Sequence, residues 1–306
     1  MRWRFYRSLL VICAALVMQR FAGTTTEIST AVLGLSLLGG LVHGGYDHAV
    51  AARWSRWKGL FGQVMFHVEY VCVAAAVLGL WWLAPTGALL LFLTSAAVHF
   101  GESDLAHRGP QPAFVTWSRG AVIVFAPMLA WPAEAEQMLS SLAGVHGVSL
   151  LPLEGVAPLV APGVLVWGHL ASLVWQAREQ EWDPAILETE LLAAGAVAML
   201  CLSAGPLLGI AAYFALWHTP DHFASLRSGQ HRMSAILWAS IPRGLAMVGP
   251  LIALWWLAPD VGAWARWVVV LTSALTLPHA LLTHLAQRRP HDSSTHVAPL
   301  SLVPPQ

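Results

Sequence analysis

The chain is dominated by apolar stretches that are each about long enough to cross a lipid bilayer. A membrane-spanning helix needs roughly 17 to 25 mostly apolar residues, and Pro, Gly and charged residues divide the sequence into such stretches. Hydrophobic residues make up 57% of the 306 residues and charged ones 10%, which excludes an ordinary soluble domain. The sequence predicts an all-α, polytopic integral membrane bundle of eight to ten transmembrane helices. The candidate stretches are 8–23, 28–50, 61–83, 87–107, 113–131, 159–177, 187–203, 207–225, 234–257 and 263–287.

The basic residues near the ends of these stretches indicate the orientation of the chain. Cytoplasmic connections of membrane proteins carry an excess of Lys and Arg. With ten helices and a turn at 203–206, the Lys and Arg residues of the connections and termini fall on one side, and the opposite connections contain none. We therefore expect a multi-pass protein of the inner (cell) membrane with both termini in the cytoplasm. The residues on the cytoplasmic side are Arg2, Arg4, Arg7, Arg53, Arg56, Lys58, Arg108, Arg178, Arg227, Arg232, Arg288 and Arg289.

The domain organisation follows from the same pattern. Residues 1–289 are predicted to form a single transmembrane helical domain. The polar, Pro-rich residues 290–306 are predicted to be a disordered cytoplasmic tail. The formal net charge is zero, so no electrostatic surface for a nucleic-acid partner is expected.

Four histidines share one depth on this map. His43, His99, His218 and His279 each lie seven or eight residues before the predicted cytoplasmic end of a helix, which is roughly 11 to 12 Å at 1.5 Å per residue. His222 follows His218 by one helical turn, so both can face one ion. An isolated membrane histidine more often makes a hydrogen bond between helices, but five imidazoles at one level predict a metal site.

Four of these histidines lie in three stretches that also contain carboxylates. The stretches read HGGYDH from residue 43, HFGESD from residue 99 and WHTPDH from residue 217. A metal-bound imidazole usually donates its other N–H to a carboxylate or carbonyl oxygen, which makes Asp47, Asp104 and Asp221 candidates for that contact. Alternatively, each of these three carboxylates caps a helix end or is a solvated charge at the cytoplasmic face.

The identity of the metal is left open by the residue types alone. A site made of imidazoles suits Zn, Cu, Fe or Ni and disfavours Mg and Ca. A zinc hydrolase would need a general base beside the ion, for which Glu102 is the candidate. A redox iron would need an open position for O2.

The three stretches, in this order and separated by membrane helices, resemble the signature stretches of the Brp/Blh family of bacterial and archaeal beta-carotene 15,15'-dioxygenases. The resemblance covers residues 30–285. It implies a membrane Fe(II) enzyme that cleaves the central double bond of beta-carotene, or of a related carotenoid, with O2 to give two molecules of retinal. The iron ligands implied by it are His43, His99, His218 and His222.

The resemblance also assigns supporting roles. The groups expected to support the ligands or to line the cavity are Asp47, His48, Glu102, Asp104, Asp221, His279 and His284. No catalytic residue beyond the ligands is implied. The carotenoid would enter sideways from the bilayer, and a functional link to a retinal-binding rhodopsin is expected.

Two other classes of protein also cluster histidines in a membrane. A diiron desaturase or hydroxylase acting on lipids does so, but with H-x-x-H-H pairs that this sequence lacks. A metal-ion transporter would use the same histidines as a transit site. We find no convincing internal symmetry to favour it.

Overall fold

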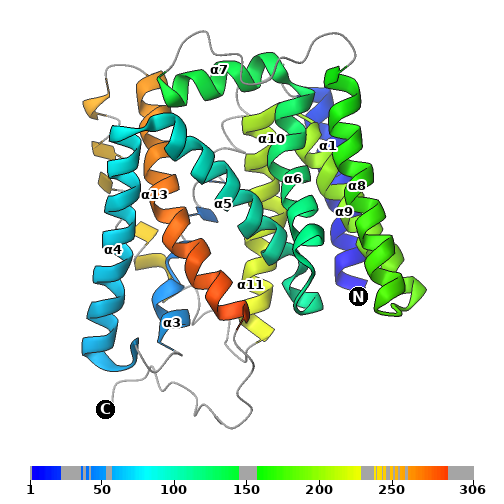
Figure 1. Cartoon of the computed structure of the whole chain (residues 1–306), viewed down its shortest axis with the longest axis horizontal. Coiled ribbons are helices and arrows are strands. Elements are labelled where there is room, and N and C mark those ends of the chain that lie inside the picture. Colours follow the sequence, from blue (N-terminus) through cyan, green and yellow to red (C-terminus); the bar gives the residue numbers. More distant parts are fainter. Residues whose placement is uncertain are drawn as a thin grey trace.

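The computed structural model of the chain is a bundle of helices with one helix lying across an end (Figure 1). It describes residues 2–21, 36, 39–40, 43–52, 57–144, 157–228, 238, 240–242, 244–245, 249–250, 252–253, 256–258 and 261–288. Within these residues the regular structure is helical and contains no strand. The prediction of an all-α fold is therefore confirmed.

The helices begin and end close to the apolar stretches of the sequence. Their bounds are α1 Arg2–Phe21, α3 Asp47–Ala51, α4 Gly59–Leu83, α5 Pro85–Leu105, η2 Ala106–Arg108, α6 Ala113–Ala130, α7 Pro132–Ala143, α8 Ala157–Glu179, α9 Pro184–Leu202, α10 Pro206–Tyr213, η3 Phe214–His218, α11 Thr219–Ser228 and α13 Val261–Arg288. Proline begins α5, α7, α9 and α10, where its missing N–H and fixed φ cost nothing. The predicted turn at 203–206 is confirmed, because α9 ends at Leu202 and α10 begins at Pro206.

Five of the described helices are long and apolar enough to cross a membrane. They are Gly59–Leu83, Ala113–Ala130, Val160–Glu179, Pro184–Leu202 and Arg266–Leu285. Helix α5 is not among them, since the polar residues of HFGESD at its end lower its mean hydropathy. The count of eight to ten spans stays a prediction. The expected spans 28–50 and 234–257 lie only in part within the described residues, and the whole of 290–306 lies outside them.

Two glycines let α5 and α6 approach closely beside the HFGESD stretch. A Cβ atom on Gly101 would overlap the carbonyl oxygen of Thr116, and one on Gly120 would overlap the carbonyl oxygen of Ala97. Small residues at a helix crossing allow backbones to meet in this way. The crossing places the polar end of α5 against the first half of α6.

The WHTPDH stretch lies where one helix type changes into another. Residues Phe214–His218 form a turn of π-helix between α10 and α11, and Pro220 follows within the first turn of α11. Proline cannot donate the usual backbone hydrogen bond, and single π turns occur often at functional sites. The chain therefore has a widened turn that ends at His218, directly before α11.

Candidate metal centre

The structure gathers five histidines from separate parts of the chain into one group, the imidazole cluster. The ring centroid of His43 lies 3.8 Å from that of His222 and 4.6 Å from that of His279. It also lies 4.9 Å from that of His218, which in turn is 5.2 Å from that of His99. The cluster therefore brings together at least one histidine from each of the three stretches and one from α13: His43, His99, His218, His222 and His279.

Three members of the cluster place their ring nitrogens close enough to approach one ion. One nitrogen from each of His43, His99 and His218 lies within 4.8 Å of the other two. Nitrogens that share an ion can be at most about 4 Å apart, twice a metal–nitrogen distance of about 2 Å. All three residues are buried, so a small adjustment of buried side chains would bring them to that spacing.

Two nitrogens of the cluster have no partner within the described part of the chain. These are Nδ1 of His43 and Nε2 of His218, both buried. A buried nitrogen without a hydrogen bond carries a desolvation cost, which binding to an ion would remove. The donor set of neutral imidazoles suits iron, and equally zinc, copper or nickel. The residues therefore fit a transition metal.

A chain of hydrogen bonds fixes the ring of His43. Nδ1 of His279 lies 2.7 Å from Oδ1 of Asp47, and Nε2 of His279 lies 2.9 Å from Nε2 of His43. The carboxylate only accepts, so Nδ1 of His279 carries a proton, and Nε2 of the neutral ring accepts from His43. This leaves Nδ1 of His43 unprotonated, which is the form that binds a metal. The Tyr70 hydroxyl also contacts Asp47, at 3.1 Å.

The ring of His99 is oriented by a threonine on α13. The Thr283 hydroxyl lies 3.1 Å from the carbonyl oxygen of His279 and 3.0 Å from that of Ala280. Because its single hydrogen points to these carbonyls, the hydroxyl accepts from Nδ1 of His99 at 3.2 Å. Nε2 of His99 is thereby left unprotonated. Thr283 was not predicted from the sequence, since one threonine in an apolar helix carries no distinguishing signal.

Two further residues predicted to support the ligands pair with each other. Both carboxylate oxygens of Glu102 lie 2.8 Å from Nδ1 of His284, and both side chains are partly exposed. His48 donates from Nδ1 to the carbonyl oxygen of Gly45 at 3.1 Å. That Glu102, His284 and His48 support the metal ligands stays a prediction.

Asp104 and Asp221 make different contacts from those expected. Arg119 donates to Oδ2 of Asp104 at 2.9 and 2.7 Å, and the Tyr213 hydroxyl donates to Oδ1 at 2.8 Å. Arg7 donates to Oδ1 of Asp221 at 2.7 Å. A charged guanidinium binds a carboxylate more strongly than a neutral ring does, and the prediction that Asp104 and Asp221 support the ligand histidines stays a prediction.

Arg119 and Tyr213 are therefore polar residues near the cluster that the sequence analysis did not select. The ring of Tyr213 lies 5.9 Å from that of His218, and Arg119 is 2% exposed. An arginine within the apolar stretch 113–131 is a recognisable signal, since a charge inside a membrane helix needs a partner.

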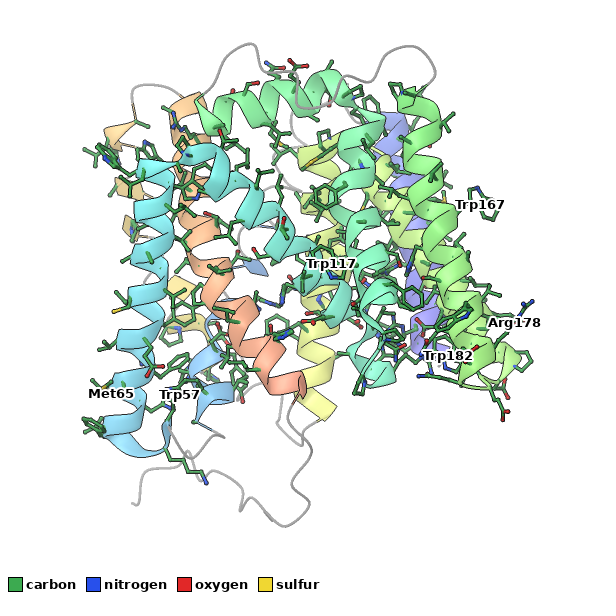
Figure 2. All side chains as sticks on the ribbon, in the orientation of Figure 1. Trp57, Met65, Trp117, Trp167, Arg178 and Trp182 are labelled. Carbon is green, nitrogen blue, oxygen red and sulfur yellow. The ribbon has the colours of Figure 1, made fainter. Side chains whose placement is uncertain are left out.

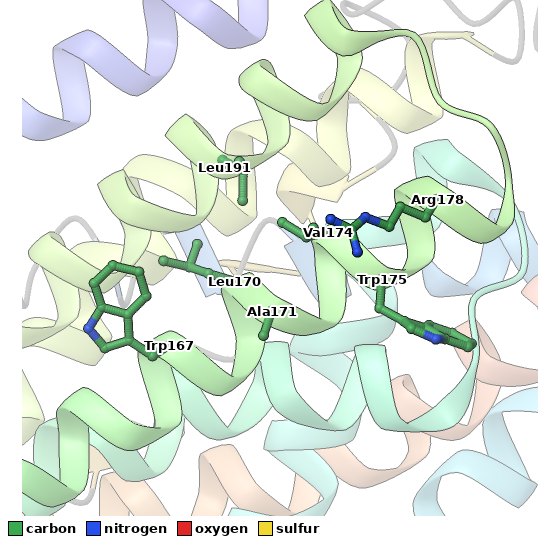
Figure 3. Close-up of a pocket in the computed structure, with 7 residues that line it drawn as sticks. All are labelled: Trp167, Leu170, Ala171, Val174, Trp175, Arg178 and Leu191. Carbon is green, nitrogen blue, oxygen red and sulfur yellow. The ribbon is translucent and has the colours of Figure 1, made fainter.

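The described surface also has an apolar groove of about 490 Å³, which is separate from the imidazole cluster. It is lined by residues of α8 and α9 (Figure 3): Trp167, Leu170, Ala171, Val174, Trp175, Arg178 and Leu191. Trp167 and Arg178 project from the outer side of α8 (Figure 2). Neither helix contributes a member of the imidazole cluster, so the groove is no part of the candidate metal site.

The chain was compared with known proteins. Residues 32–287 match the family model described as beta-carotene 15,15'-dioxygenase. The chain is also 23% identical over 279 residues to a protein of Halobacterium salinarum named "Probable beta-carotene 15,15'-dioxygenase Blh", and the similarity covers 78% of this chain and 79% of that protein. No solved structure matches the chain significantly.

Proposed function

The chain belongs to the beta-carotene 15,15'-dioxygenase family, and from this premise we propose that it is a membrane enzyme that uses Fe(II) and O2 to cleave beta-carotene at its central double bond. The observation that carries the proposal is the buried imidazole cluster, with two partnerless nitrogens, at the three motifs. Membership in a family of carotenoid-cleaving dioxygenases favours an enzyme over the metal transporter or the diiron lipid oxidase.

The proposed iron ligands are four histidines of the three stretches: His43, His99, His218 and His222. The unprotonated nitrogens of His43 and His99 support this set, and so does the free Nε2 of His218. His279 holds His43 in place and is itself held by Asp47. When bound, iron supplies the redox chemistry that activates O2.

The residues around the cluster have two tasks in the proposed reaction. Asp47, His279 and Thr283 hold the ligand rings in their metal-binding tautomers. The apolar helices exclude water and admit an apolar polyene from the bilayer. The bond between the two central carbons breaks, and each carbon receives one atom of O2, so two retinal molecules form and no further reductant is needed.

The setting of the enzyme is part of the proposal. The five apolar helices are consistent with a membrane protein. The inner membrane, the cytoplasmic position of both termini, a single domain over 1–289 and a functional link to a retinal-binding rhodopsin remain proposals that rest on the sequence.

Expression in a bacterium that makes beta-carotene tests the proposed reaction. The cells should lose the orange pigment and accumulate retinal when aerated, and longer aldehydes should be nearly absent because cleavage is central. The matched control is His218→Ala, present in the membrane in the same amount, which should leave the pigment intact. Pigment that persists with the unaltered protein in iron-replete cells contradicts the proposal.

A further inference from the structure

Helix α1 reaches the WHTPDH stretch although it lies outside residues 32–287, which match the family model. Its Arg7 is 4% exposed and is buried among other helices. Nη1 of Arg7 donates to Asp221 at 2.7 Å, and Nη2 donates to the carbonyl oxygen of Trp217 at 3.1 Å. The guanidinium carbon lies 3.9 Å from the centroid of the Trp217 ring.

These three contacts use the features that distinguish arginine from lysine. The guanidinium is planar, presents several N–H donors in a fixed fork and stacks on aromatic rings. The Arg7 guanidinium contacts the carboxylate of Asp221 and both the carbonyl oxygen and the indole ring of Trp217, which lies four residues earlier. A lysine ammonium in the same place lacks the flat shape that makes the combination possible.

The contacted residues have a particular relation to the proposed ligands. Trp217 directly precedes His218, and Asp221 directly precedes His222. The backbone here runs from a π turn into a helix that contains Pro220, so its regular hydrogen bonding is interrupted. Arg7 supplies an external donor to a carbonyl of this segment, which restricts how the segment can rotate.

Helix α1, which carries Arg7, is also held in place. Arg4, one turn before Arg7 on α1, lies 3.7 Å from Asp221 and 3.7 Å from Glu190 of α9. Glu190 is 3% exposed and is further bound by Arg108 at 2.8 Å. Several buried charges thus lock α1 against α9, and Arg7 extends from a helix that is itself held in place.

We propose that Arg7 is a positioning residue for the metal centre. By binding Trp217 and Asp221, the residues directly before His218 and His222, it fixes the spacing of the two histidines. Helix α1 would then contribute to the metal centre through this clamp. This inference rests on the proposed function, because it assumes that the two histidines bind the metal. The clamp acts through Trp217 and Asp221 and does not touch the metal or the substrate.

The test is a cobalt(II) titration of the full chain, purified in detergent and stripped of its iron with a chelator. The visible absorption bands of cobalt(II) report both its affinity and its coordination geometry. Arg7→Met should weaken binding roughly 10- to 100-fold, the usual effect of losing a group that orients a metal ligand, and should shift the bands. Asp221→Asn should change the spectrum in the same direction.

The matched control is Arg108→Met, which removes another arginine from the same charged network but does not contact WHTPDH. It should lower the melting temperature and leave the cobalt spectrum unchanged, because Arg4 still joins α1 to both Glu190 and Asp221. If Arg7→Met does not fold, Arg7→Lys decides, since it keeps the charge and should still bind cobalt more weakly than the unaltered protein.

The outcomes separate the two proposals. Unaltered protein that binds no cobalt overturns the proposed metal function and the clamp with it. Unaltered protein that binds cobalt, with Arg7 variants that have the same affinity and spectrum, overturns the clamp alone. Equal spectral changes in Arg7→Met and Arg108→Met also contradict it, since they indicate a general loss of structure.

Discussion

Asp47 and Asp104 occupy similar places in two motifs and do different work. Asp47 follows His43 by four residues and Asp104 follows His99 by five, and both are buried. Asp47 accepts from His279 and so orients a ring of the imidazole cluster. Asp104 accepts from Arg119 and Tyr213 and so joins α5 to α6 and α10. The contacts of a carboxylate in these stretches therefore depend on which side chains the neighbouring helices present to it.

The largest effect on stability is expected at Asp104. Asp104→Ala leaves the guanidinium of Arg119 buried without its partner, and breaking a buried ion pair on one side costs about 3 to 5 kcal/mol. Unfolding of the purified protein in detergent should show this loss. Adding Arg119→Met should recover most of it, because no unpaired charge remains. A double variant no more stable than Asp104→Ala would show that the pair is not the cause.

The largest effect on metal affinity is expected at Asp47. Asp47→Asn weakens the acceptor that holds His279, so iron affinity should fall roughly 10- to 100-fold with a smaller loss of stability. Asp104→Asn is the matched change and should show the reverse ranking, with stability affected more than affinity. Iron titrations and melting curves of the two variants measure both properties. Identical rankings would remove the distinction between the two carboxylates.

A smaller effect is expected at Tyr70, whose hydroxyl contacts Asp47 at 3.1 Å and the carbonyl oxygen of Leu275 at 3.0 Å. Tyr70→Phe removes one hydrogen bond, worth about 0.5 to 1.5 kcal/mol, and leaves Asp47 in contact with His279. Iron affinity should therefore fall only a few-fold. A loss as large as that of Asp47→Asn would place Tyr70 among the essential supports of the cluster.

The helices were predictable because the length of an apolar run limits a membrane helix directly. The stretches 61–83 and 113–131 correspond to Gly59–Leu83 and Ala113–Ala130. The gathering of His43, His99, His218, His222 and His279 followed from a shared depth on the predicted helices.

The partners of the carboxylates were not predictable in the same way. Arg119 is 15 residues from Asp104 and Arg7 is 214 from Asp221, so their pairing depends on which helices pack together. The π turn at Phe214–His218 also has no simple sequence signal beyond Pro220. The local sequence pattern predicts the depth of a residue along its helix, and tertiary packing determines which side chain it contacts.

The central claim is that four histidines of the three stretches hold one iron. Metal analysis of the purified protein, beside the four single variants His43→Ala, His99→Ala, His218→Ala and His222→Ala, tests it most directly. We expect about one iron per chain in the unaltered protein and almost none in each variant, with membrane insertion preserved. Full iron occupancy in His218→Ala, or no transition metal in the unaltered protein, would contradict the claim.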